Sequence, residues 1–357
     1  MAFTPGTLWP DNNGVHINAH GGAMLFHDGY YWWFGEHKVA GDAGNKAEVG
    51  VHVYRSTDLY SWEDQGIALF VSDDMSHGIA RGCILERPKV LFNKLTNRFV
   101  MWFHLEPKGK GYLGARVGVA VAERVAGPYR FVKSFRPDAG IWPLNVDDNE
   151  KSPLAPEEFA GTKYTGAAFD GYDAKRLFRR DFTDGQMSRD MTLFADDDDT
   201  AYHIYASEEN GVLHISQLTP DYLGSSGRWA RAFPGRFMEA PAMFRHNGKY
   251  WIIASGCTGW KPNAARSAVA DSPFGPWKDL GNPWIGADVD TAISFDSQPA
   301  FIFPVQGRPG AFIFLGDRWR PENAIDGRYI WQPIEFENDR PVLRWHDSWD
   351  LRFFDRP

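Results

Sequence analysis

Five segments of the chain repeat one pattern of polar and hydrophobic positions. Each segment opens with a polar residue, continues as a short apolar stretch, turns, and ends in a stretch rich in aromatic side chains. The segments are Ala19–Glu36, Glu86–His104, Arg189–Glu209, Glu239–Gly256 and Ser297–Trp319. Self-similarity of this kind is typical of repeat architectures.

Each repeat continues into two further stretches in which apolar and polar residues alternate, as they do in strands. Examples are Val49–Gly66 and Arg116–Val132. The turns His27–Gly29 and His246–Gly248 contain Asp-Gly and Asn-Gly pairs, which tolerate the positive φ angles of tight hairpins. No stretch has the periodicity of a long amphipathic helix. The pattern predicts an all-β fold: a single five-bladed β-propeller over residues 1–357, with about four antiparallel strands per blade.

The blades are expected to start near residues 19, 86, 189, 239 and 297. Because the innermost strands of a propeller surround one axis, the polar residues that open the repeats should share a pocket. These residues are His20, Glu86, Asp190, Glu239 and Gln298. The last residues, Trp349–Pro357, are predicted to form a strand that closes the ring.

One insertion, at about residues 137–187, interrupts the repeats between the second and third copies. Loops of this length are usually functional or disordered. Its aromatic residues, Trp142, Tyr164, Tyr172 and Phe178, argue against disorder. We expect the insertion to lie over one face and shape the mouth of the pocket. The alternative is a flap that packs away from the pocket.

Composition and charge exclude several classes of protein. The net charge is -8 and no basic block is present, so no nucleic-acid partner is expected. The longest apolar runs are too short to span a bilayer, and the first residues lack the features of a secretory signal. The chain is therefore predicted to be soluble and to have no membrane partner. The sequence does not determine its cellular compartment. No nucleotide, flavin or haem motif is present, so no cofactor is expected.

Metal and disulfide chemistry also receive little support. Cys83 and Cys257 lack the neighbours of a metal site and are expected to be free thiols. The acidic run Asp196–Asp199 lacks the glycine and distal glutamate of a calcium loop and is expected to be a solvated turn. No metal site is predicted. The many aromatic residues, with Trp 15, Tyr 13 and Phe 26, suit both strands and sugar-stacking surfaces.

The acidic residues among the repeat heads suggest chemistry. If Glu86, Asp190 and Glu239 share a pocket, their mutual repulsion should raise the pKa of at least one of them. A protonated carboxyl beside an ionised one is the arrangement that glycoside hydrolysis needs. The same acids could instead bind a cation or water.

Two motifs carry a resemblance to glycoside hydrolase family 43, whose members are five-bladed propellers. They are Glu-Ala-Pro at Glu239–Pro241 in the fourth repeat and Arg-Asp-Met at Arg189–Met191 in the third. The resemblance covers nearly the whole chain. It implies that Glu239 is the general acid and that Asp190 adjusts its pKa and orients it.

The first repeat departs from the usual family pattern. The family places an aspartate general base there, whereas this chain has Asn-Ala-His-Gly-Gly at Asn18–Gly22. This departure resembles the exo-β-1,3-galactanases. The other motifs shared with that subfamily are Phe34–Glu36, Glu86–Lys89, Thr258–Trp260 and Ser297–Gln298. The resemblance implies that Gln298 handles the attacking water, as an imidic acid or by position alone. Asp290 and Asp296 are the nearest carboxylate alternatives.

Further pocket residues are predicted from the same resemblance. Glu36 and Glu86 match positions that hold galactose hydroxyls, with ion pairing to Lys38 or Arg87 as the alternative. The remaining predicted substrate-binding residues are His20, Tyr112, Thr258 and Trp260. His20 could instead be a core histidine. Glu208 and Glu209 are expected to line the opposite rim.

The sequence thus predicts an inverting, exo-acting glycoside hydrolase that releases terminal galactose from β-1,3-galactan-type glycans, with an oligosaccharide or polysaccharide as its partner. Inversion implies a gap of roughly 6.5–9.5 Å between the two catalytic groups. The first alternative is a β-galactofuranosidase or α-arabinofuranosidase on the same scaffold. The second is a carbohydrate-binding propeller without catalysis.

Overall fold

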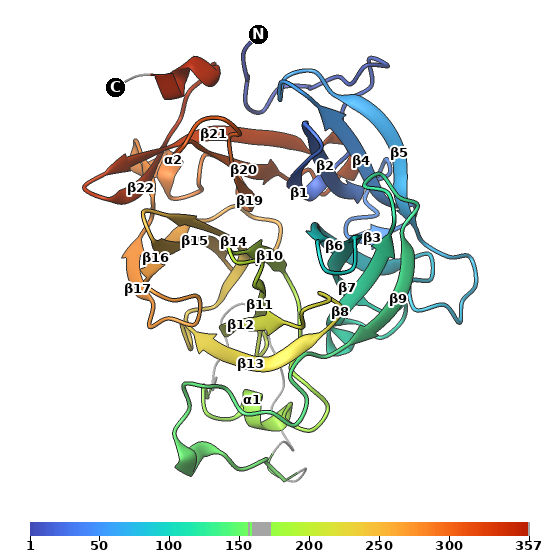
Figure 1. Ribbon diagram of the computed structural model, residues 1–357, viewed down its shortest axis with the longest axis vertical. Coiled ribbons are helices and arrows are strands. Elements are labelled where there is room, and N and C mark those ends of the chain that lie inside the picture. The colour runs from blue at the N-terminus through green and yellow to red at the C-terminus, as the bar shows by residue number, and fades with distance from the viewer. Residues whose placement is uncertain (156–157, 159–172, 356–357) are drawn as a thin grey trace.

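The computed structural model describes residues 1–155, 158 and 173–355. The strands of these residues form five sheets arranged as a ring (Figure 1). In each sheet the four main strands follow one another from the centre outward in the order of the sequence. The predicted five-bladed β-propeller is confirmed, and every inner strand begins within three residues of the predicted blade start.

Each blade is built from one contiguous segment. Blade one contains β1 (His20–His27), β2 (Tyr30–His37), β4 (Gly50–Ser56) and β5 (Glu63–Phe70). Blade two contains β6 (Cys83–Asn93), β7 (Arg98–Glu106), β8 (Arg116–Ala122) and β9 (Arg130–Phe135). Blade three contains β10 (Met191–Ala195), β11 (Ala201–Ser207), β12 (Val212–Leu218) and β13 (Ser225–Ala232).

Blade four contains β14 (Met238–His246), β15 (Lys249–Gly256), β16 (Arg266–Ala270) and β17 (Lys278–Gly281). Blade five contains β19 (Gln298–Pro304), β20 (Phe312–Arg318), β21 (Arg328–Glu337) and β22 (Arg340–Arg344). Two short strands join sheet edges: β3 (Lys46–Ala47) pairs with β6, and β18 (Trp284–Ile285) pairs with β22. The helical segments are α1 (Leu177–Arg180), α2 (Asp288–Thr291), η1 (Tyr112–Gly114), η2 (Asp148–Glu150), η4 (Ala324–Asp326) and η5 (Leu351–Asp355).

The predicted tight turns join the inner two strands of blades one and four. In the β1–β2 turn, Asp28 and Gly29 both have positive φ, at 49° and 80°. Asn247 and Gly248 repeat this geometry between β14 and β15, at 49° and 74°. Two consecutive positive φ angles match the right-handed twist of the strands that a two-residue hairpin connects.

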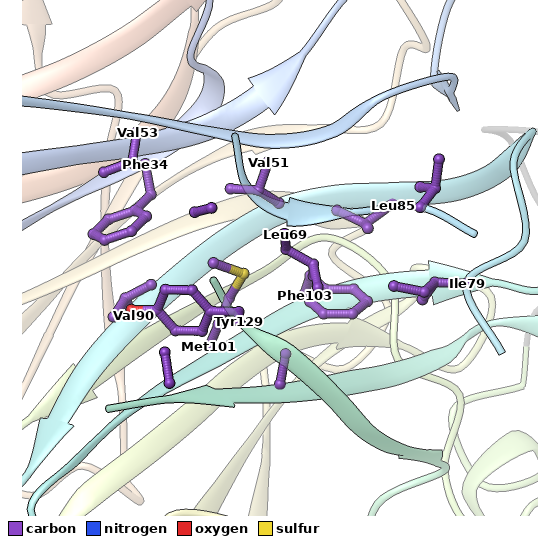
Figure 2. Packing of buried hydrophobic residues seen from close by; sticks show 14 of the residues in the cluster. Phe34, Val51, Val53, Leu69, Ile79, Leu85, Val90, Met101, Phe103 and Tyr129 are labelled. Atoms are coloured by element: carbon purple, nitrogen blue, oxygen red, sulfur yellow. The ribbon is translucent and has the colours of Figure 1, made fainter. Parts of the chain in front are cut away.

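The core lies between neighbouring blades. Phe34, Val51 and Val53 of blade one pack against Met101 and Phe103 of blade two (Figure 2). Because most blade faces meet another blade, strands such as β2 are buried along nearly their whole length. This explains why the aromatic second strands of the repeats read as continuous apolar runs.

The two chain ends close the ring, but not with a strand as predicted. Leu351–Asp355 form the 3₁₀ helix η5, because blade five already has its outer strand in β22. Phe3 and Trp349 instead exchange two backbone hydrogen bonds of 2.7 and 3.1 Å. Their rings lie 4.3 Å apart in a cluster of buried aromatic residues from blades one and five, which includes Trp33 and Trp331.

The described part of the insertion packs against the outer edge of blade three, outside the ring (Figure 1). The backbone N–H of Leu144 donates to the Trp229 carbonyl of β13 at 2.8 Å. Trp142 and Phe178 pack near Trp229. This is the packed flap considered as the alternative, and it covers an edge strand that would otherwise be exposed. Tyr164 and Tyr172 lie outside the described residues.

The described residues include no helix long and apolar enough to cross a membrane.

We expect Phe3→Ala to lower the free energy of unfolding by about 3–5 kcal/mol, because it leaves a cavity among the buried aromatic rings that join the chain ends. Urea unfolding followed by tryptophan fluorescence measures this change. Phe26→Ala is the control, since Phe26 is 39% exposed. Equal losses in both variants would contradict a special role for the closure.

Candidate active site

Residues from all five blades line one pocket of about 130 Å³. The structure brings together seven of the predicted site residues: Glu36, Glu86, Tyr112, Asp190, Glu239, Trp260 and Gln298. The pocket also has lining residues that the sequence did not single out as site residues: Lys38, Asn45, Arg87, His104, Arg189, Asn210, Gly259 and Trp319. Of these, Arg87, His104, Arg189 and Trp319 have a sequence signal, because they stand inside the repeat segments that carry Glu86, Asp190 and Gln298.

Irregular backbone at the start of the inner strands directs side chains into this pocket. The register between paired strands shifts just after His20, Glu86 and Glu239. The residue that follows each of them has a positive φ: 57° at Gly21, 54° at Arg87 and 51° at Ala240. Bulges re-aim side chains in this way and are common next to active sites. Backbone strain at Arg87 and Ala240 is therefore associated with function here.

Arg87 is a buried cation at the centre of the site. Its Nη2 lies 3.0 Å from Asp190 Oδ2 and 2.6 Å from Gln298 Oε1. Its Nη1 donates to the Pro299 carbonyl at 2.9 Å, and its backbone N–H donates to Glu36 Oε1 at 2.9 Å. One residue of blade two thus contacts blades one, three and five.

Glu239 has the properties of a general acid. Burial and the negative charge of Asp190 raise the pKa of Glu239 to about 8, against an opposing effect of Arg87. The carboxyl group is therefore protonated at neutral pH. Asn210 Nδ2 and Gln298 Nε2 approach its two oxygens at 3.4 and 3.2 Å.

Gln298 contacts the acid directly, which corrects the expected gap between these two groups. Its Nε2 lies 3.2 Å from Glu239 Oε1 and 3.0 Å from Ser255 Oγ. Its Oε1 accepts hydrogen bonds from Arg87 and from Trp319 Nε1, the latter at 2.8 Å. Protein groups thus hold both ends of the amide, so a water-filled gap does not separate this pair.

Cations hold the two carboxylates predicted to bind sugar. Glu36 Oε2 lies 2.6 Å from Lys38 Nζ, and Glu86 Oε2 lies 3.0 Å from His104 Nδ1. Burial lowers the pKa of His104, but its hydrogen bonds to Glu106 and Glu86 outweigh this effect and raise the pKa to about 9. The ion pairs fix the orientation of both carboxylates while both still line the pocket.

Glu86, His104 and Asp190 each offer one ligand atom within 4.8 Å of the others, a spacing that could hold a metal ion. A histidine ligand must be neutral, however. His104 is clamped between Glu86 and Glu106, at 3.0 and 3.2 Å, and its raised pKa keeps it charged. These residues therefore fit a sugar hydroxyl better than a metal.

Two predicted substrate-binding residues lie away from the pocket. His20 is fully buried and stacks on Tyr329, with ring centroids 5.3 Å apart. It is a core histidine, the alternative considered from the sequence. Thr258 does not line the pocket, and its hydroxyl bonds within its own loop, to Asn263 and Lys261.

Glu208 and Glu209 are buried ion-pair partners rather than rim residues. Glu208 binds Arg231 and His214 at 2.6 and 2.8 Å. Glu209 binds Arg189, a pocket residue, at 2.9 Å.

The two carboxylate alternatives to Gln298 do not line the pocket itself. Asp296 lines a smaller hollow beside it, together with Gln298 and Trp319. Asp296 pairs with Arg318 at 3.1 Å, and Asp290 belongs to α2.

Exposed aromatic rings mark the mouth of the pocket. Tyr112 is 55% exposed and Trp260 is 41% exposed. The Trp260 ring meets Trp319 edge-on at 5.6 Å, and the Arg189 guanidinium lies 4.7 Å from the centre of the Tyr112 ring. A sugar chain leaving the pocket would pass between these surfaces.

The model of the family described as Glycosyl hydrolases family 43 matches residues 173–339. A solved family 43 β-1,3-galactosidase with galactodeoxynojirimycin is 49% identical, with 98% of this chain and 100% of that chain covered and a TM-score of 0.91. The chain belongs to glycoside hydrolase family 43. The resemblance recognised in the sequence, and with it the class of enzyme, is confirmed.

Two further solved members of the family share the fold. The exo-β-1,3-galactanase from Clostridium thermocellum is 34% identical, with 97% of this chain and 66% of that chain covered and a TM-score of 0.77. The exo-β-1,3-galactanase from Phanerochaete chrysosporium, solved with β-1,3-galactotriose, is 31% identical, with 98% and 68% covered and a TM-score of 0.78. No curated protein matches the chain.

We expect Asp190→Asn to move the alkaline limb of the pH profile of kcat/KM to lower pH. In the unchanged protein this limb should lie near the Glu239 pKa of about 8. The reason is that Asp190 raises this pKa, and the variant leaves the opposing effect of Arg87 in place. Asp271→Asn is the control, because Asp271 is exposed, pairs with Lys249 and does not line the pocket. An unmoved limb in Asp190→Asn would refute the electrostatic role.

Proposed function

We propose that this family 43 enzyme is an exo-acting β-galactosidase that releases terminal galactose from β-1,3-galactan-type chains with inversion. The observation that carries the proposal is the partly buried Glu239, whose pKa is raised to about 8, in a pocket where cations hold the carboxylates of Glu36 and Glu86. The likeness to solved β-1,3-galactosidase and exo-β-1,3-galactanase structures supports galactose as the sugar.

In the proposed reaction Glu239 donates its proton to the glycosidic oxygen. The carboxylate that forms keeps the N–H of Gln298 as a donor at 3.2 Å. Asp190 acts on Glu239 through its charge, and its own position depends on Arg87. Glu36 and Glu86 are placed to accept hydrogen bonds from sugar hydroxyls, with geometry set by Lys38 and His104.

The role of Gln298 follows from its contacts. An amide oxygen has two lone pairs, and here Arg87 and Trp319 use both. For this oxygen to orient the attacking water, one of these two donors must move aside when substrate binds. We infer that Gln298 acts by position: it holds the acid and Arg87, and presents its oxygen to water only in the complex.

The sugar ring is tested by proton NMR of the anomeric signals during digestion of β-1,3-galactobiose and of a β-galactofuranoside. Initial release of α-galactopyranose from galactobiose is expected. Cleavage of the furanoside alone would be consistent with Glu239 as the acid but would identify a β-galactofuranoside as the substrate. Binding without cleavage of either would favour a carbohydrate-binding propeller.

We expect Glu239→Gln to reduce hydrolysis of β-1,3-galactobiose by about 10²–10⁴-fold, because a sugar leaving group needs a proton. Galactose binding, measured by calorimetry, should persist. Galactosyl fluoride is the control substrate, since fluoride leaves with less help, and its hydrolysis should fall less. Unchanged turnover of galactobiose would show that Glu239 is not the general acid.

We expect Gln298→Ala to lower kcat for galactobiose by about 10²-fold or more, because it removes one contact of the acid and one of Arg87. Single-turnover kinetics separate this loss from a change in binding. A rate near that of the unchanged enzyme would indicate that a carboxylate, and not Gln298, orients the attacking water.

A further inference from the structure

A buried chain of ion pairs leads from the insertion to the pocket. Arg180 of α1 lies 2.7 Å from Asp181 and 3.1 Å from Glu209. The other oxygen of Glu209 lies 2.9 Å from Arg189, which lines the pocket. Glu209 is thus shared by one guanidinium from the insertion and one from the third repeat.

A second branch begins at Arg136, immediately before the insertion. Its Nη1 lies 3.7 Å from Asp181, the same carboxylate that pairs with Arg180. Its Nη2 donates to the Leu113 carbonyl at 2.7 Å, and its Nε donates to the Ala115 carbonyl at 3.3 Å. The Leu113 carbonyl belongs to η1, the short helix that begins with Tyr112, and the Ala115 carbonyl follows its last residue.

Both branches end on one wall of the pocket. The Arg189 guanidinium lies 4.7 Å from the centre of the Tyr112 ring, and both residues line the pocket. Tyr112 is 55% exposed, whereas Glu239 is partly buried. In an exo-acting enzyme the terminal sugar enters first, so the remainder of the chain lies toward the exposed side.

We propose that Arg136, Arg180, Asp181 and Glu209 form a positioning network that holds the Tyr112–Arg189 wall for the sugar on the leaving-group side of the cleaved bond. The inference rests on the proposed function. The insertion, which does not line the pocket with its described residues, acts on substrate recognition through this network.

The charges explain why the network holds the wall. Asp181 and Glu209 are buried, and a buried charge is tolerated only when it is paired. Glu209 lies between two guanidinium groups, so removing its charge leaves Arg180 and Arg189 to repel each other. Arg189 would then move relative to the Tyr112 ring. Glu239 lies in blade four and forms none of these ion pairs; the residue that links it to the network is Asn210, which follows Glu209 and donates to Glu239 at 3.4 Å.

The test compares two substrates in one variant. We expect Glu209→Gln to lower kcat/KM for β-1,3-galactobiose on the order of tenfold, chiefly through a higher KM, because a charge-assisted contact of Arg189 is lost. β-Galactosyl fluoride has no second sugar, so its kcat/KM should change less than about twofold. The ratio of the two values is the readout, and a general loss of stability does not change it.

Glu208→Gln is the matched control. Glu208 is the preceding residue and is equally buried, but its ion-pair partners Arg231 and His214 do not line the pocket, whereas Arg189, a partner of Glu209, does. The ratio in Glu208→Gln should equal that of the unchanged enzyme. Arg180→Gln provides a second variant with a more exposed side chain if Glu209→Gln does not fold, and Arg180→Lys should restore part of the ratio.

An unchanged ratio in Glu209→Gln and Arg180→Gln, or an equal change in Glu208→Gln, would overturn the inference. Failure of the unchanged enzyme to cleave either galactosyl substrate would overturn the proposed function and, with it, this role. The two failures are distinguishable, because only the second is visible without any variant.

Discussion

The active site depends on one buried cation, Arg87. Burial lowers its pKa, but the carboxylates around it, with Asp190 and Glu36 foremost, outweigh burial and raise it. Without a central positive charge, the carboxylates that gather at the axis would repel one another and take up protons. The contacts of Arg87 with Asp190, Gln298 and the Pro299 carbonyl also tie three blades together. Arg87 therefore both holds neighbouring blades together and arranges the side chains of the pocket.

The backbone of blade two makes this arrangement possible. The positive φ of Arg87 sends its side chain toward blades three and five, while Lys89, two residues later, donates from its ammonium group to the Gly21 carbonyl of blade one at 2.9 Å. Gly21 must lack a side chain, because a Cβ there would lie 2.2 Å from Glu36 Oε1. Burial and the neighbouring Arg87 lower the pKa of Lys89 to about 7. The two basic residues of this motif thus have different roles: Arg87 supports the pocket, and Lys89 joins blade two to blade one.

The sequence was sufficient to predict the fold and seven of the fifteen residues that line the pocket, because blade repeats bring residues far apart in the chain to one axis. It could not place His20: the same register shift follows His20, Glu86 and Glu239, but the His20 ring stacks on Tyr329 in the core, and Glu36 of the second strand lines the pocket instead. Glu208 and Glu209 were misplaced for another reason. Their partners Arg231 and Arg180 come from β13 and the insertion, and nothing in the local pattern reveals such contacts. The sequence located the insertion and left a packed flap open as the alternative, but it could not identify the edge that is covered, since the packing depends on Trp229 in a strand that follows the insertion.

The balance of charges around Glu239 explains how one carboxyl group can act as an acid near neutral pH. Burial and Asp190 favour its protonated form, and Arg87 favours its ionised form. Asp190 and Arg87 also bind each other at 3.0 Å, so each limits the influence of the other on Glu239. A stronger effect of Asp190 would give an acid that holds its proton too tightly, and a stronger effect of Arg87 would give one that is already ionised. When Glu239 loses its proton, Arg87 and the N–H of Gln298 stabilise the new charge with groups that are already in place, so little reorganisation is needed at the moment of bond cleavage.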